Sequence, residues 1–473
     1  MYLIAGGVWE NIGKALVEMI RAGRHRGNGF SLWTDVGTLS SGVSRVENVP
    51  VGRVGLLALG NLGRAQPLVG ELALLHRGGI YNGRLIRAFL EGRGVSFDTD
   101  SDREVILRLL EFLKGRGLSL PQAVGEAMRW LEGDYAVAFF DGGRIYLFRD
   151  PIGMRPLYFS PNGFFASEKK VLWAIGERAT PVAPGELVIL DGRSVRRVKL
   201  FSLEQLRGRA LPEKSVLRGL KNILSNAVRN RVAKKTGVLF SGGLDSTLVA
   251  LLASSYSDVT LYTAGAEGSQ DVEWAGRVAD YLGLPLRVRH FDVDDIKEAL
   301  PKVVFAIEEP NPMNIAIGLP LYFASQLASR EGVQVLLSGQ GADELFGGYA
   351  KYLERPGLMW EDLLTMSERN LARDDKVATL NGVDGRHPFL ALPVVGLALR
   401  TPPELKIGGG RKVILRRLAR ELGLPDWIAE RPKKAAQYGS NAQKLLRRIA
   451  RERGLSLGEL AETLFREVFR NAF

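Results

Sequence analysis

The chain has 473 residues, of which 46% are hydrophobic and 25% are charged. This length predicts two or three domains of roughly 150 residues each, and the composition excludes a chain that is disordered throughout. The 64 Lys and Arg residues outnumber the 52 Asp and Glu residues by 12, but this surplus is spread over a large surface and selects no partner by itself. Cysteine is absent, which excludes disulfides, thiolate metal ligands and a cysteine nucleophile.

Several features argue against a membrane or a nucleic acid as partner. The N-terminus has no basic leader before its short apolar run, and no stretch approaches the ~18 uninterrupted apolar residues that a membrane span needs. We therefore expect a cytoplasmic protein. The four histidines lie far apart, which predicts no histidine metal site. The basic stripe over residues 444–451 lacks interleaved aromatic residues, so we interpret it as a solvated helix face.

The first 200 residues read as α+β with antiparallel sheet. Residues 135–148 and 186–198 each form a hairpin pattern, in which two apolar runs flank an Asp-Gly turn. Ser101 or Asp102 can cap a helix over residues 103–115, because the apolar side chains of that stretch fall on one helical face.

After residue 199, short apolar strands alternate with helical stretches. The expected strands are 236–240, 259–265 and 285–291, and the expected helices are 244–254 and 270–283. Such alternation predicts a parallel sheet whose ligands bind at the carboxyl ends of the strands. Beyond residue 341 the chain is mostly helical. We therefore expect a first domain over 1–200, a linker over 201–214 and a second domain over 215–473.

The sharpest local signal is SGGLDS at residues 241–246, which lies between an expected strand and an expected helix. Gly242 and Gly243 allow a tight turn that directs backbone N–H groups at an anion, and the helix N-terminus adds its positive dipole end. Ser241 and Ser246 add hydroxyls, and Asp245 can hold Mg²⁺ against phosphate oxygens. The alternative is a glycine turn that only starts a helix.

A second loop, LSGQGADELFGGY at residues 337–349, also follows an apolar strand. At the same sheet edge, Ser338 and Gly339 can contact adenine or ribose, and Asp343 with Glu344 can provide further metal ligands. The alternative is that these two acids only favour the dipole of the helix that they begin. Together the two loops predict a site for ATP and Mg²⁺.

With these loops the chain resembles the asparagine synthetases of the glutamine-dependent type. The second half adds the matching stretches 370–390, 410–417 and 430–435, and the first half adds 25–29, 66–68, 79–82, 101–107, 149–159, 165–172 and 184–187. The resemblance implies an N-terminal class II amidotransferase-like sandwich, with antiparallel sheets between helices. An α/β parallel-sheet ATP-pyrophosphatase domain with a helical C-terminal part then follows.

The resemblance also implies a reaction and its residues. A carboxylate is activated as an acyl-adenylate with release of pyrophosphate, and an amide then forms, most simply from aspartate and ammonia to asparagine. By the same resemblance Leu239, Ala264, Ser338 and Gly339 contact the nucleotide, Asp245 and Asp343 hold Mg²⁺, and Lys412 stabilises the pyrophosphate. The family commonly forms homodimers, but the sequence itself indicates no interface, so the oligomeric state is left open.

The glutaminase positions depart from the family pattern. The N-terminal cysteine that attacks glutamine is replaced by Tyr2, whose phenol is a poor substitute for a thiolate. Arg77 replaces the oxyanion-hole asparagine and Gly79 replaces the acid that grips the glutamine amine, although Asp102 is retained. We therefore expect a folded first domain without glutaminase activity, and ammonia that is free or supplied by a separate glutaminase.

The positions of the synthetase half that bear on the acceptor substrate depart less from the family pattern. Gln340 stands where many relatives carry an acid that manages the proton of the amine, so Asp384 is a candidate base, unless the amine arrives already neutral. Asp384 itself replaces a family glutamate, and Ala391 replaces an aspartate. One alternative is therefore a related synthetase or cyclase with another acceptor, like the β-lactam synthetases or the lasso-peptide cyclases. Another is a catalytically silent, nucleotide-binding partner subunit.

Overall fold

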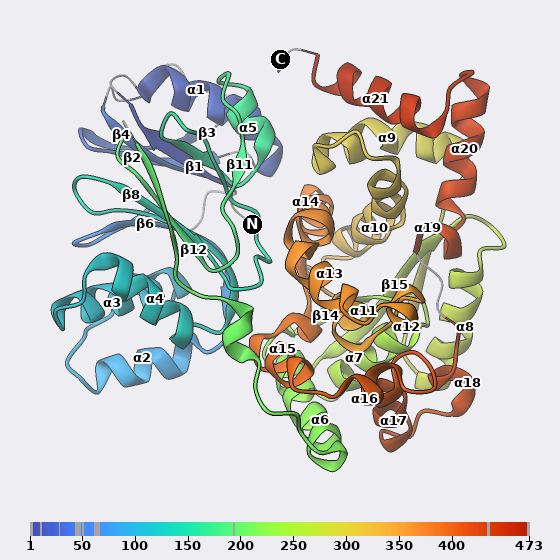
Figure 1. Cartoon of the computed structure of the whole chain (residues 1–473). Helices are drawn as coiled ribbons and strands as arrows, with labels where there is room; N and C mark the ends of the chain where they lie inside the picture. Colours follow the sequence, from blue (N-terminus) through green and yellow to red (C-terminus); the bar gives the residue numbers. More distant parts are fainter. Residues whose placement is uncertain are drawn as a thin grey trace. The chain divides into compact units, whose positions relative to one another are not determined.

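The computed structural model describes residues 3–9, 12–27, 29–42, 49, 52–60, 67–192, 194–432 and 436–470, with the side chains of 40–42 left aside. The chain divides into two compact units, one that ends at Leu203 and one that spans Glu204–Arg470 (Figure 1). No helix in these described ranges is long and apolar enough to cross a membrane.

The first unit is built on two antiparallel sheets. One has the strand order β11-β9-β10-β1-β4-β2-β3, and the other has the order β13-β12-β8-β7-β6-β5. The strands are β1 Leu3–Val8, β2 Gly29–Thr34, β3 Gly37–Gly42, β4 Val54–Gly60, β5 Leu68–Val69, β6 Ala73–Ile80, β7 Gly133–Phe140, β8 Ile145–Arg149, β9 Tyr158–Phe159, β10 Phe164–Ala166, β11 Thr180–Pro181, β12 Glu186–Leu190 and β13 Val195–Lys199. The helices are α1 Ile12–Gly23, α2 Gly83–Glu91, α3 Asp102–Gly115, α4 Leu120–Trp130 and α5 Lys169–Trp173.

Strand alternation creates two cores in this unit. Ile4 on β1 lies in a cluster shared by both sheets, with residues such as Leu75 on β6. Its neighbour Leu3 points to the opposite face, where it packs with Leu16 of α1. Successive side chains on a strand face opposite ways, so one sheet can pack on a second sheet and on helices at once.

The expected elements of the first unit are confirmed. The two hairpins are the β7-β8 and β12-β13 pairs, both antiparallel. Helix α3 is capped by Ser101, whose Oγ accepts a hydrogen bond of 3.4 Å from the backbone N–H of Glu104.

The second unit contains a parallel sheet with the strand order β16-β15-β14-β17-β18. The strands are β14 Lys235–Leu239, β15 Asp258–Gly265, β16 Leu286–His290, β17 Val335–Leu337 and β18 Asp384–Arg386. Along the chain, β15 and β16 are added in turn on one side of β14, and β17 and β18 are then added on its other side. The loops that follow the adjacent strands β14 and β17 therefore lead away in opposite directions. Doubly wound sheets bind ligands at such a position.

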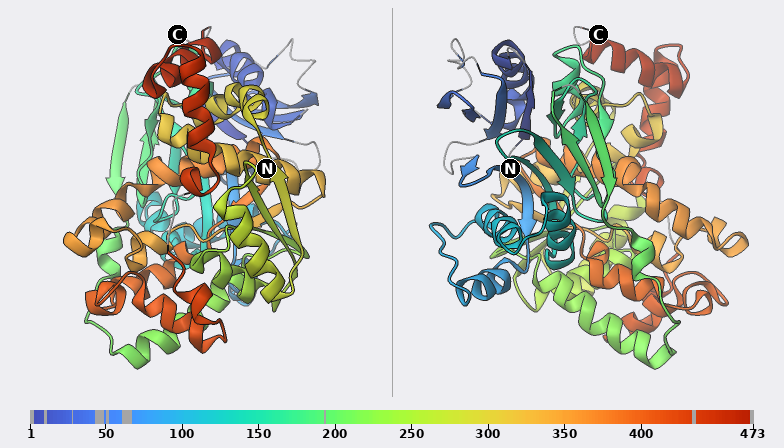
Figure 2. Two further views of the ribbon diagram at one scale, coloured as in Figure 1. Left: turned by 90° about the vertical axis from the view of Figure 1, so that its right-hand side faces the viewer. Right: turned by 60° about the vertical axis from the view of Figure 1, so that its left-hand side comes forward.

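Helices flank this sheet and form the C-terminal part of the unit. They are α6 Glu213–Arg229, α7 Leu244–Ser254, α8 Gln270–Leu282, α9 Val293–Ile307, α10 Pro312–Arg330, α11 Ala342–Phe346, α12 Lys351–Glu354, α13 Leu358–Met366, α14 Ala372–Leu380, α15 Leu392–Leu399, α16 Pro403–Ile407, α17 Val413–Glu421, α18 Asp426–Ala429, α19 Ala436–Gly439, α20 Ala442–Glu452 and α21 Leu457–Val468. Helix α10 packs on β14, β15 and β16 and also contacts α14, and α20 and α21 pack beside α9 (Figures 1 and 2). The fold class expected from the sequence is thus confirmed.

Candidate active site

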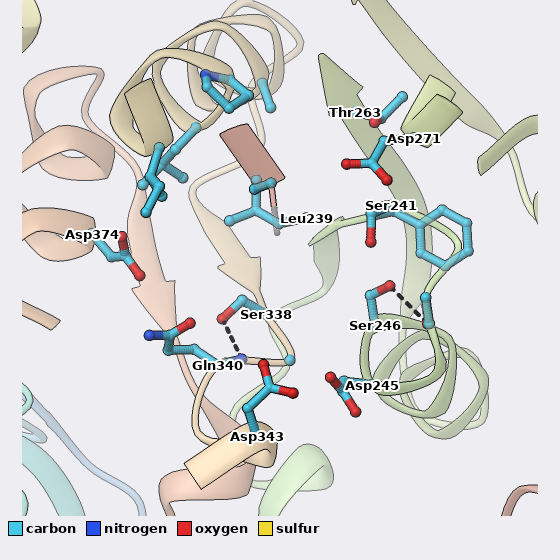
Figure 3. Close-up of a pocket in the computed structure, with 18 of the residues that line it drawn as sticks. Leu239, Ser241, Asp245, Ser246, Thr263, Asp271, Ser338, Gln340, Asp343 and Asp374 are labelled. Carbon is cyan, nitrogen blue, oxygen red and sulfur yellow. Dashed lines mark hydrogen bonds between the residues drawn. The ribbon is translucent and has the colours of Figure 1, made fainter. Parts of the chain in front are cut away.

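A cavity of ≈ 290 Å³ lies at the carboxyl ends of β14 and β17. Its walls come from the loops that follow these two strands, from α10 and α14, and from the segment that leads into α17 (Figure 3). The predicted site residues that line it are Leu239, Ser241, Gly243, Asp245, Ser246, Ala264, Ser338, Gly339, Gln340, Asp343 and Lys412. Segments far apart in the sequence therefore meet at the sheet edge where the βαβ pattern predicts a ligand.

The loop after β14 is held in one tight conformation. Gly242 has a φ of +66°, and a Cβ atom there would lie 2.7 Å from the carbonyl oxygen of Trp274. Both features require glycine. The hydroxyls of Ser246 and Thr247 donate hydrogen bonds to the Gly243 carbonyl, at 3.1 and 2.8 Å. Gly242 thus packs against the backbone of Trp274, while Gly243 lines the cavity.

Arg431 anchors the same loop from the C-terminal part of the chain. Its guanidinium donates a hydrogen bond to the Ser241 carbonyl and forms an ion pair with Asp271, with 3.0 Å between Nη2 and Oδ1. Burial lowers the pKa of Arg431, and the negative charge of Asp271 opposes this shift. Arg431 and Asp271 are site residues that the sequence analysis missed, although Arg431 lies in the matched stretch 430–435.

The loop after β17 touches the first loop directly. A Cβ atom on Gly339 would lie 2.6 Å from the Cβ of Asp245, so only glycine permits this approach. The Ser338 Oγ lies 2.8 Å from Nδ1 of His387 and accepts a hydrogen bond of 3.2 Å from the Gln340 N–H. His387 is a second cavity residue that the sequence analysis did not select.

Lys412 lies between the two acidic residues of the loops. Its Nζ contacts Oδ2 of Asp245 and lies 2.6 Å from Oδ1 of Asp343. The lysine occupies the left-handed region with a φ of 57°, directly before α17, and only 6% of it is exposed. A Cβ atom on Gly348 would overlap Asp343 and the Lys412 side chain. The two carboxylates and the ammonium therefore form one compact, nearly buried cluster.

The donor set of this cluster suits Mg²⁺. No group of three or more His, Cys, Asp or Glu side chains that could hold a metal occurs within the described ranges. Protein sites for Mg²⁺ in nucleotide enzymes, however, usually supply one or two carboxylates and leave the remaining positions to phosphates and water. The buried Oδ1 of Asp245 has no hydrogen-bond partner among the described residues, so this oxygen is available to coordinate a metal ion.

Glu344 does not reach the cavity. Its Oε1 accepts hydrogen bonds from Tyr349 and Asn370, both at 3.3 Å, and burial raises the pKa of its carboxyl group. Of the two acids in the loop after β17, only Asp343 lines the pocket.

Asp384 also lies outside the cavity lining. It begins β18 and pairs with Val335, the first residue of β17, so it lies at the amino end of the sheet rather than at the carboxyl end. Its Oδ2 accepts a hydrogen bond of 2.7 Å from Nε of Arg386. The structure therefore does not bring the candidate base of the sequence analysis to the other site residues. The fourth carboxylate of the pocket belongs instead to Asp374 on α14, which the sequence analysis did not select.

We call Tyr2, Arg77, Gly79 and Asp102 the glutamine-pocket remnant, and its described members belong to the first unit. Tyr2 is outside the described residues. Gly79 on β6 is close to Asp102 at the start of α3, because a Cβ atom on Gly79 would lie 3.8 Å from Oδ2 of Asp102. That oxygen accepts a hydrogen bond of 2.9 Å from the Ile80 N–H, and Arg77 is only 2% exposed. Arg77 is thus buried, and the carboxylate of Asp102 is held by the backbone of β6.

Another matched stretch of the first unit, residues 25–29, contributes to a buried charge cluster. Glu168 is fully buried and contacts Arg26, the Nζ of Lys170 at 2.7 Å and the Nε2 of His25 at 2.8 Å. Although burial alone raises the pKa of Glu168, the positive charges of Arg26 and Lys170 hold it well below its usual range. Burial lowers the pKa of His25, with Glu168 opposing the shift. The charged side chains of the matched stretches 25–29 and 165–172 therefore bind one another inside the unit.

Comparisons with known proteins agree with both units. Residues 219–360 and 357–473 match a family profile described as asparagine synthase, and residues 57–174 match a glutamine amidotransferase domain profile. A putative asparagine synthetase [glutamine-hydrolyzing] 1 of Methanocaldococcus jannaschii is 34% identical, over 95% of each chain. Asparagine synthetase B [glutamine-hydrolyzing] of Escherichia coli is 29% identical, over 89% of this chain and 78% of that protein. A probable asparagine synthetase [glutamine-hydrolyzing] of Schizosaccharomyces pombe is 30% identical, over 75% and 69%.

Proposed function

The chain belongs to the asparagine synthetase family, and is thus an ATP-dependent carbon–nitrogen ligase; we propose that it converts aspartate and ammonia to asparagine through an acyl-adenylate. In the first step a carboxylate oxygen of aspartate attacks the α-phosphorus of ATP, and the bond to pyrophosphate breaks. In the second step the nitrogen of ammonia attacks the acyl carbon, and AMP leaves with the electron pair of the C–O bond.

The observation that carries this proposal is the cluster of Lys412, Asp245 and Asp343 beside the glycine turn of the first loop. Backbone N–H groups at the start of α7 and the dipole of that helix favour an anion at the turn. Leu239 and Ala264 supply apolar surface in the same cavity, which suits a purine base. One pocket thus combines surfaces for the two ends of a nucleoside triphosphate.

Asp245 and Asp343 are the residues that would hold Mg²⁺, which supplies charge neutralisation for the phosphates when it is bound. Lys412 is the cation that would stabilise the negative charge of the departing pyrophosphate. Its Nζ is already held by both carboxylates, so its position is fixed before a substrate arrives, and little reorganisation is required during the reaction.

Ammonia rather than glutamine is the proposed nitrogen donor. Hydrolysis of glutamine in this family begins with attack by an N-terminal thiolate, and the chain contains no cysteine. Arg77 and Gly79 stand at the positions of the oxyanion donor and of the amine-binding acid. With these three functions missing, we propose that the first unit hydrolyses no glutamine and that ammonia is free or comes from a separate glutaminase.

The test is release of pyrophosphate from ATP and Mg²⁺ with ammonium present, compared across aspartate, glutamate and no added carboxylate. We expect release that depends on aspartate and that matches the asparagine formed. The Asp245→Asn variant should lower it by about 1,000-fold or more. Asp258→Asn, at the amino end of β15 and away from the pocket, should not lower it. Release that is independent of aspartate, or release without asparagine, would refute the proposed substrate.

A second candidate is a related synthetase that activates another carboxylate and in which the substrate's own amine replaces ammonia. The neutral Gln340 in the pocket favours it, because many relatives carry an acid at this position. In that case ATP and a carboxylate other than aspartate would support release of pyrophosphate, and ammonium would not be required.

A further inference from the structure

The contacts of each carboxylate that lines the pocket indicate its role. Among the described residues the cavity is lined by four of them, Asp245, Asp271, Asp343 and Asp374. Asp245 and Asp343 hold Lys412, and Asp271 holds Arg431 against the first loop. Asp374 is the remaining carboxylate, and the two proposed chemical steps have not used it.

Asp374 is positioned by α14 and by its neighbour. Nε of Arg373 donates a hydrogen bond of 2.8 Å to Oδ1 of Asp374, and Nη1 of Arg373 donates one of 3.1 Å to Oδ1 of Asn314 on α10. The guanidinium therefore fixes one oxygen of Asp374 while being fixed itself from a second helix. The side chain of Asp374 is 14% exposed, and the residue lines the cavity.

Asp374 and Gln340 lie on the same side of the pocket. Figure 3 shows both at the left of the view, whereas Ser241, Ser246 and Asp271 lie at the right and Asp343 lies below. The Gln340 backbone is fixed by the hydrogen bond of its N–H to Ser338. An amide side chain at position 340 accepts no proton at neutral pH. A proton acceptor on this side of the cavity must therefore come from another element, and Asp374 is the carboxylate that lies there.

We propose that Asp374 accepts the proton that the attacking amine releases, an inference that rests on the proposed amide-forming function. As the nitrogen of ammonia bonds to the acyl carbon it becomes strongly acidic. A proton passes from this nitrogen to Asp374, the C–O bond to AMP breaks, and the electron pair leaves with AMP. The products are the amide, AMP and a protonated Asp374, which returns its proton to solvent.

Other titratable groups in the second unit are less suitable. Asp384 lies at the amino end of β18 and binds Arg386. The Nδ1 of His387 is in contact with Ser338 Oγ. Asp245 and Asp343 are assigned to the metal and to Lys412, where a second proton-transfer role would compete with charge neutralisation of the phosphates.

Separate assays of the two half-reactions distinguish a role in proton transfer from a structural role. Exchange of pyrophosphate into ATP, dependent on aspartate, reports the first step, and asparagine formation from ammonium reports both steps. For Asp374→Asn, which keeps the shape of the side chain, we expect exchange to change by less than about 3-fold and amide formation to fall by about 100-fold. Asp374→Glu should restore a part of the amide formation.

Hydroxylamine provides a second readout, because it is a weaker base than ammonia, so its nitrogen loses the proton more readily after attack and depends less on a proton acceptor. Formation of the hydroxamate by Asp374→Asn should fall much less than formation of asparagine. Adding Gln340→Glu to Asp374→Asn should recover part of the loss, because it returns a carboxylate to the same side of the pocket. Asp384→Asn should change exchange and amide formation by the same factor.

Two results would overturn the inference while the proposed function stands. One is normal asparagine formation by Asp374→Asn, and the other is an equal loss of exchange and of amide formation, which would indicate a structural role through Arg373. Absence of aspartate-dependent exchange in the unmodified protein would refute the proposed function, and the inference with it.

Discussion

The pocket of the second unit and the charged residues of the matched stretches in the first unit differ in what their charges contact. In the second unit Asp245, Asp343 and Lys412 gather at a cavity, and a buried oxygen of Asp245 has no hydrogen-bond partner within the described ranges. In the first unit the Oδ2 of Asp102 binds a backbone N–H, and Glu168 is enclosed by its cations. Charges that face a cavity are available for chemistry, whereas charges satisfied by the fold contribute to its stability.

The largest expected effect is at Asp245. Asp245→Asn should lower aspartate-dependent release of pyrophosphate by about 1,000-fold or more, because it removes half of the proposed metal ligands and one contact of Lys412. Steady-state assay of pyrophosphate measures this. Asp258→Asn is the matched control, as this exposed acid lies at the amino end of β15. Retained activity in Asp245→Asn would contradict the contrast between the two units.

A smaller loss is expected at Lys412. Lys412→Met should reduce kcat by about 100-fold, since the leaving pyrophosphate loses a positioned cation and the two carboxylates lose their shared partner. Lys302→Met, which removes an exposed cation on α9, should leave kcat unchanged. A rise in KM for ATP with no change in kcat would instead indicate that Lys412 only binds the ground state.

Gly348 tests how closely the cluster is packed. In Gly348→Ala the new Cβ would lie 1.8 Å from Oδ1 of Asp343 and 2.5 Å from Cε of Lys412, so one of these groups must move. We expect a loss of about 10-fold in kcat, because small displacements of catalytic groups are costly. Gly357→Ala is the control, as a Cβ there meets nothing within 4 Å. Equal activities of the two variants would show that the cluster tolerates rearrangement.

The smallest effect concerns stability in the first unit. Burial, with help from Arg103 and Arg155, lowers the pKa of His76 to about 3. Below the ordinary value of 6.5 the unfolded chain binds a proton that the folded unit does not bind, so the free energy of unfolding decreases as pH falls. Between pH 7.5 and pH 5 this group should account for about 2 kcal/mol.

Urea denaturation of the unmodified protein and of His76→Gln at both pH values measures this contribution as a difference. Other groups, such as Asp150, whose pKa is raised to about 6 by burial, cancel in the comparison. An identical pH dependence for the two proteins would mean that His76 is protonated within the fold. Ammonia-dependent activity should be unaffected, which separates the stability of the first unit from the chemistry of the second.

Much of the second unit could be predicted because its signals are local. The turn at Gly242 and Gly243 needs particular backbone angles, and the βαβ alternation determines which loops meet at the sheet edge. The contacts of Arg431 with Ser241, and the exposure of Asp374 to the cavity, depend on how distant helices pack, which periodicity does not reveal. Strand register places Asp384 at the amino end of β18, outside the cavity lining, and periodicity does not reveal this register either.

The most direct measurement is asparagine formation by the purified chain with ATP, Mg²⁺ and aspartate, with ammonium or glutamine as the only nitrogen source. The account predicts asparagine with ammonium, accompanied by an equal amount of pyrophosphate, and none with glutamine. Asparagine formed from glutamine, together with glutamate, would contradict the account. It would mean that the first unit hydrolyses glutamine without a cysteine.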